Sequence, residues 1–163
     1  RVVLLKGRAH LKHTEGGDFR QAVYRAIRQG LCGAENVLLE PWYDFTATLP
    51  ADQLGRGLAD IQRLQGTFSP PEIAGDTAVV SGSGPVATLL HYAAELPAFT
   101  RGQGHFSAVY GGYRPCHNAD EVVAAAGYDP ERDLENPPGS IFCARGAGYP
   151  VRWCEVPGMA HLK

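Results

Sequence analysis

The sequence predicts an α+β fold over residues 37–116, in which two helices cover one face of a four-stranded antiparallel sheet. The first observation is the order of expected elements, strand–helix–strand–strand–helix–strand, which is the split βαβ order. The second is strict alternation along the first strand, where Tyr43, Phe45, Ala47 and Leu49 share one face. The third is a helical stripe of Leu54, Leu58, Ile61 and Leu64. Together they predict a ferredoxin-like domain.

The six expected elements are bounded by proline and glycine. The second helix opens at Pro85, where a missing N–H costs little, and is ended or kinked near Pro97. Pro70 and Pro71 interrupt the second strand, which places it at an edge of the sheet. The predicted bounds are strand 37–49, helix 51–65, strand 66–73, strand 77–81, helix 85–95 and strand 105–110.

Shorter elements flank this domain. Before it, the sequence predicts an apolar strand over residues 2–6 and a helix from an N-cap at Asp18 to about Gln29, with Gly30 as the stop. After it, a capping-box-like start at Asn118 predicts a short helix that runs to residue 127. A polar loop follows, and residues 141–145 and 149–156 are expected to form a terminal hairpin.

Length and charge narrow the function classes. The chain has 163 residues, a formal net charge of −2 and an isoelectric point near 6.3, which argues against a stand-alone nucleic-acid binder. No apolar run approaches the roughly 18 residues of a membrane span, and no leader is visible. The chain begins at Arg1 without an initiator methionine, so we expect it to be a piece of a longer protein. Its four cysteines form no C-x-x-C pair and are expected to be free thiols of the cytoplasm.

No stretch carries recognisable catalytic, cofactor-binding or metal-binding chemistry. Cys116 and His117 offer zinc ligands with Cys143 and Cys154, but the spacing matches no finger or ribbon, so we expect no metal. The segment 81–85 lacks the lysine and the glycine spacing of a phosphate loop and is interpreted as a strand-to-helix turn. No serine, cysteine or threonine stands in a nucleophile context.

Several sequence blocks together indicate a family. Leu38-Leu39-Glu40-Pro41, the segment 82–85 and the turn Thr100-x-Gly102-x-Gly104 resemble the C-terminal part of elongation factor G. The blocks over residues 60–62, 85–88, 112–113, 116–122 and 127–137 resemble more closely the tetracycline-resistance ribosomal protection proteins and their elongation-factor-G-like relatives. The similarity extends over essentially the whole chain.

This resemblance implies a domain organisation and a partner. Residues 1–36 correspond to the closing strand and helix of a fourth domain, residues 37–116 to a ferredoxin-like fifth domain, and residues 117–163 to a C-terminal extension. The family is one of multidomain GTPases that bind the ribosome, so ribosomal RNA and proteins are the expected partners, and neither DNA nor a membrane is. GTP and magnesium are expected in the parent protein, upstream of Arg1, and the fragment itself is not expected to be an enzyme.

The resemblance also suggests which residues contact RNA. The loop 10–17 corresponds to one that approaches the drug site in resistance proteins, with Lys12, His13 and Thr14 as its polar contacts. That loop lacks the proline typical of resistance proteins, which leaves a translocase-like role open. Four arginines are expected among the RNA-facing charges: Arg20, Arg56, Arg63 and Arg101. Two alternatives remain, a small-ligand-binding regulatory module of ferredoxin-like fold and a zinc-dependent enzyme.

Overall fold

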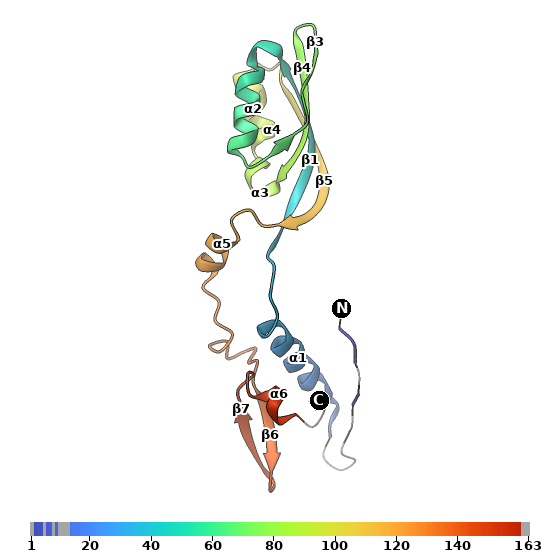
Figure 1. Ribbon diagram of the computed structural model, residues 1–163, viewed down its shortest axis with the longest axis vertical. Helices are drawn as coiled ribbons and strands as arrows, with labels where there is room; N and C mark the ends of the chain where they lie inside the picture. Colours follow the sequence, from blue (N-terminus) through green and yellow to red (C-terminus); the bar gives the residue numbers. More distant parts are fainter. Residues whose placement is uncertain (1, 5, 8, 10–13, 161–163) are drawn as a thin grey trace. The chain divides into compact units, whose positions relative to one another are not determined.

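The computed structural model describes residues 2–4, 6–7, 9 and 14–160 (Figure 1). The chain divides into two compact units. Residues 37–125 form the first, here called the central unit, and the described residues up to 36 together with those from 126 onward form the second, the flanking unit.

The central unit is built on a sheet whose strands all pair antiparallel. Its elements are β1 (Leu39–Pro50), the 3₁₀ turn η1 (Ala51–Gln53), α2 (Leu54–Arg63), β2 (Thr67–Phe68), β3 (Glu72–Ala74), β4 (Thr77–Pro85), α3 (Val86–Leu89), α4 (Tyr92–Phe99), β5 (His105–Pro115) and all but the last residue of α5 (Ala119–Ala126). The strand order is β2–β4–β1–β5, with β3 also paired to β4. This confirms the predicted α+β class and the split βαβ arrangement.

Alternation along the two central strands places the core on one face of the sheet. Phe45, Ala47 and Leu49 of β1 are buried, as are Ala78 and Val80 of β4. The helices α2, α3 and α4 lie over this face (Figure 1) and contribute Ile61, Leu89, Tyr92 and Leu96 to the same cluster. The Phe106 ring of β5 stacks on Phe45 at 5.2 Å and meets Tyr92 edge-on at 5.3 Å between ring centroids.

Several bounds in the central unit differ from the sequence predictions. The expected strand 66–73 is two short strands, because Pro70 and Pro71 cannot donate ladder hydrogen bonds between them. The segment 81–85 is the end of β4 and not a turn, since Gly82 pairs with Phe45 and Pro85 with Trp42 of β1.

Two further differences concern the second helix and the last strand. The helix expected over 85–95 is two helices, interrupted at Leu90 and His91, while Pro97 lies inside α4. The last strand continues past Tyr110 to Pro115, because Gly111 and Gly112 form an irregularity within the ladder and do not end it.

The flanking unit joins the two ends of the chain. It contains α1 (Gly16–Cys32), the hairpin β6 (Ser140–Ala144) and β7 (Ala147–Val151), and α6 (Val156–Met159). Gln29 of α1 donates through Nε2 to the Pro138 carbonyl oxygen at 2.8 Å and to Ser140 Oγ at 2.9 Å. Arg28 donates to Asn136 Oδ1 at 2.7 Å. Residues 136–140 are therefore held against the last turns of α1.

The bounds of the flanking elements also need correction. The N-cap of α1 is Glu15, and Asp18 is the N3 residue, whose Oδ2 accepts the Glu15 backbone N–H at 2.9 Å. The helix continues through Gly30, since one internal glycine costs only about 1 kcal/mol, and ends at the cap Gly33. Of the expected strand over residues 2–6, Leu5 lies outside the described residues, and residues 2–4 and 6 take no regular structure and pair with no described strand. The second hairpin strand ends at Val151 and not at residue 156.

Candidate functional site

The residues expected to contact RNA are divided between the two units. Lys12 and His13 lie outside the described residues. Thr14 is half-buried just before the Glu15 cap of α1, and Arg20 is exposed on α1 in the flanking unit. The other three expected contacts, Arg56, Arg63 and Arg101, are exposed in the central unit.

Arg56 and Arg63 belong to a group of balanced charge. Asp60 of α2 lies 3.8 Å from Arg56 Nε and 3.2 Å from Arg63 Nη2, and Arg63 Nη2 is also 3.8 Å from Glu95 of α4. The Arg56 guanidinium lies over the Phe99 ring at 4.1 Å. Two positive and two negative groups therefore cancel at this place, and a polyanion would have to compete with Asp60 and Glu95 for both arginines.

Arg101 differs from Arg56 and Arg63 in its backbone position and in its charged neighbours. It lies in the turn between α4 and β5 with φ +53°, and within the described part of the chain no carboxylate pairs with it. The turn is fixed by the buried Thr100, whose Oγ1 donates to the Leu96 carbonyl oxygen and accepts the Gly104 N–H, both at 2.7 Å. A rigid turn thus presents one uncompensated guanidinium.

The sheet face that the helices leave uncovered carries an arginine that sequence reasoning missed. The Arg114 guanidinium of β5 stacks over the Trp42 ring at 4.5 Å, donates to Ser83 Oγ at 3.0 Å and lies 3.5 Å from Asp44 Oδ1. A shallow, hydroxyl-rich depression on the same sheet is lined by residues that include Thr46, Thr67, Ser69, Ser81, Ser83 and Ser107. The sequence did indicate this face, because the polar residues Asp44, Thr46 and Thr48 alternate with the apolar residues of β1.

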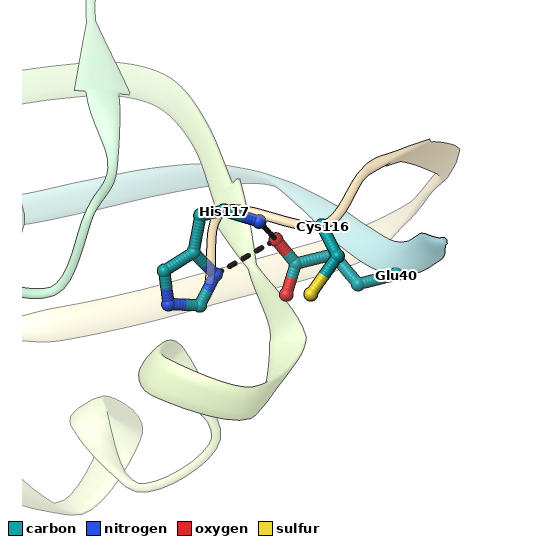
Figure 2. A group of neighbouring side chains, drawn as sticks. All are labelled: Glu40, Cys116 and His117. Atoms are coloured by element: carbon teal, nitrogen blue, oxygen red, sulfur yellow. Dashed lines mark hydrogen bonds and ion pairs between the residues drawn. The ribbon is translucent and has the colours of Figure 1, made fainter. Parts of the chain in front are cut away.

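A second missed group lies where the chain enters β1 and leaves β5 (Figure 2). Glu40 is buried, with 7% of its surface exposed, and its Oε1 accepts the His117 backbone N–H at 2.9 Å. The same oxygen lies 2.8 Å from His117 Nδ1. Cys116 Sγ adjoins the pair, and one ligand atom from each of the three residues falls within 4.8 Å of the others.

Strand pairing holds this group together. Leu39 pairs with Pro115 and Glu40 with Arg114, and the Cys116 N–H donates to the Leu38 carbonyl oxygen at 2.8 Å. The zinc candidates Cys143 and Cys154 named from the sequence belong to the flanking unit, where both are exposed free thiols. Glu40 stands 77 residues from His117 in the chain, so no spacing pattern could have indicated it.

Comparison with known proteins gives a family match. The family described as "Elongation factor G C-terminus" matches residues 37–122. Elongation factor G 2 of Streptomyces coelicolor is 35% identical over 113 residues, which cover 69% of this chain and 16% of that protein. Tetracycline resistance protein TetP of Clostridium perfringens is 30% identical over 97 residues, or 60% of this chain and 15% of that protein. The chain therefore spans about a sixth of the length of these relatives.

Two further findings concern the fold and the membrane. A crystal structure of a Thermus thermophilus protein aligns with a TM-score of 0.50 and 29% identity, covering 57% of this chain and 14% of that one. Among the described residues, every helix is too short or too polar to cross a lipid bilayer.

Proposed function

This chain belongs to the elongation factor G C-terminus family, and on that premise we propose that it is the ribosome-binding C-terminal region of a translational GTPase. One observation carries the proposal: the family match over residues 37–122 coincides with the central unit, residues 37–125, and includes the fixed turn that presents Arg101. Ribosomal RNA is the partner for which an exposed guanidinium on a rigid turn is suited, because arginine binds phosphate oxygens through two N–H groups at once.

The same proposal assigns different functions to this region and to the rest of the parent protein. GTP and magnesium bind elsewhere in the parent, and this region transmits the accompanying conformational change without catalysing hydrolysis. The segment 81–85 does not form a phosphate-binding turn, because it is paired into the sheet as the end of β4. A cytoplasmic location follows from the ribosomal partner.

Within this function we propose the ribosomal protection type, which displaces tetracycline. Support comes from the similarity to TetP and from the blocks at residues 116–122 and 127–137. The similarity to elongation factor G 2 favours the alternative, a translocase-like factor, as does the absence of proline from the loop 10–17. Growth of a sensitive host on tetracycline decides between them. Rescue by the full-length gene supports protection, and growth no better than the empty vector contradicts it.

Ribosome affinity of the full-length protein tests the interface. Replacing Arg101 with alanine should remove one phosphate contact, so the slope of log affinity against log salt should fall by about 0.7–0.9. Arg56→Ala and Arg63→Ala should each have a smaller effect, because Asp60 and Glu95 already neutralise those arginines. Arg20→Ala tests the contribution of the flanking unit.

Arg132→Ala is the matched control, since Arg132 is exposed, pairs locally with Asp129 at 3.3 Å and is not an expected contact. Sedimentation with ribosomes at several salt concentrations measures all five variants. If Arg101→Ala and Arg132→Ala bind alike, the proposed contact is wrong. If the intact protein fails to sediment with ribosomes even at low salt, the whole proposal is wrong.

A further inference from the structure

Three side chains of different metal-binding chemistry meet at the junction of β1 and β5. Glu40 offers a carboxylate, Cys116 a thiol and His117 an imidazole, and Figure 2 shows the sulfur and the ring directed toward the carboxylate. From this geometry we propose that these residues bind one divalent transition-metal ion of the zinc type. The proposal is independent of ribosome binding.

The distances suit such an ion with little rearrangement. Zinc bonds of about 2.0–2.3 Å in a tetrahedron place neighbouring ligand atoms about 3.3–3.6 Å apart. Here the carboxylate and imidazole atoms are 2.8 Å apart and the whole group lies within 4.8 Å, so small side-chain rotations are sufficient. The backbone holds two of the three side chains near one another, because Glu40 is in the ladder and the Cys116 N–H donates to the Leu38 carbonyl oxygen.

The ligand types select the kind of ion. A thiolate with an imidazole favours zinc over magnesium or calcium, which prefer sites made of oxygen atoms alone. The ligand charges match a divalent cation of any kind, because the Glu40 carboxylate and a Cys116 thiolate together carry two negative charges. A buried carboxylate needs such compensation, and without the ion Glu40 Oε1 accepts the His117 backbone N–H and lies 2.8 Å from His117 Nδ1.

Metal binding changes where Cys116 and His117 carry their protons. The Cys116 thiol releases its proton to solvent as the sulfur–metal bond forms, so zinc affinity rises with pH. A neutral His117 that binds through Nδ1 carries its proton on Nε2. The fourth position is filled by water or by Asn118, whose Oδ1 lies 3.4 Å from Cys116 Sγ.

The expected role is structural. The ion links the start of β1 to the segment that leaves β5 for α5, closing a loop of 77 residues. An ion that binds the folded state alone raises the melting temperature of the chain, and the rise grows with the ratio of ion concentration to dissociation constant.

Metal retention by the full chain tests the proposal. The chain is stripped with a chelator, reloaded with Zn²⁺ or Co²⁺ and passed through a desalting column. We expect one equivalent of zinc to remain, and with Co²⁺ we expect thiolate-to-metal charge-transfer absorption together with the visible bands of a four-coordinate site. Cys116→Ser should abolish the charge-transfer band and weaken binding by more than the roughly 10–100-fold that outer partners of metal ligands contribute.

Cys143→Ser is the matched control, because it makes the same substitution at a thiol outside the site. Glu40→Gln and His117→Ala should also lose the metal, and circular dichroism of the metal-free variants separates this loss from unfolding. If the wild type keeps no more metal than Cys116→Ser, the proposal is wrong. It is also wrong if the charge-transfer band survives in Cys116→Ser and disappears in Cys143→Ser.

Discussion

Replacing Tyr92 with phenylalanine tests what a buried hydroxyl group costs the core. Tyr92 is one of the largest fully buried side chains among the described residues. Tyr92 has 1% of its surface exposed, and its ring meets Phe106 edge-on. The hydroxyl has no hydrogen-bond partner among the described residues. Burial, followed by the negative charges of Asp60 and Glu95, raises the pKa of Tyr92 from 10.0 to about 12.

The magnitude follows from the cost of an unpartnered polar group. Burying a hydroxyl without a hydrogen bond costs about 1–3 kcal/mol, while deleting one oxygen atom from a packed ring forfeits a smaller amount of contact energy. Tyr92→Phe should therefore raise the free energy of unfolding by about 1 kcal/mol. For a unit of this size the melting temperature should rise by about 4–8 °C.

The pH dependence has a definite sign. Below about pH 10 both the folded and the unfolded chain keep the Tyr92 proton, so this group does not affect stability there. Between pH 10 and 12 the unfolded tyrosine ionises and the folded one does not, so the wild type loses stability as pH rises. Phenylalanine cannot ionise, and the advantage of Tyr92→Phe should grow across this range.

Urea denaturation followed by far-ultraviolet circular dichroism measures both effects, at pH 7 and at intervals from pH 9 to 11.5. The matched control is Tyr110→Phe, because Tyr110 is 61% exposed and its hydroxyl is not a core group. If Tyr92→Phe is less stable than the wild type by 1 kcal/mol or more at pH 7, the hydroxyl is satisfied in the folded chain and the argument from an unpartnered group is refuted.

Three substitutions test the packing of the sheet and its turn by thermal melting. Gly82→Ala should lose about 1–3 kcal/mol, because a Cβ there would come within 2.1 Å of the Thr67 carbonyl oxygen. Gly55→Ala has open space around it in α2 and should instead gain up to about 1 kcal/mol, so equal effects of the two would contradict this account. Thr100→Val should lose about 1–3 kcal/mol by leaving the Gly104 N–H without its acceptor, and an unchanged melting point would exclude that role.

Sequence patterns predicted those features of the central unit that depend only on residues close together in the chain. Alternation along β1 identified Phe45, Ala47 and Leu49 as core residues, since a strand facing one core has a period of two. The interruption at Pro70 and Pro71 was also confirmed, because proline lacks an N–H in any context.

The ends of strands that we inferred from glycine residues were predicted less well. Gly82 and Gly111 were interpreted as marks of a turn and a strand end, yet both lie inside strands. Gly82 is there because Thr67, Phe45 and Phe68 leave no room for a Cβ. Gly111 stands in the irregularity of β5 beside Gly112, whose φ is +94°. Close approach by a distant segment and a local turn both favour glycine, so the sequence alone does not separate them.

By itself, the sequence determined the fold class of the central unit, the buried face of β1 and the family, because hydrophobic periodicity and contiguous motifs are local properties of a chain. Tertiary structure decided which functional groups meet. It paired Arg56 and Arg63 with carboxylates of α2 and α4, whereas no carboxylate of the described residues pairs with Arg101. It also brought Glu40 to Cys116 and His117, since the register between β1 and β5 depends on packing of the whole sheet and not on spacing along the chain.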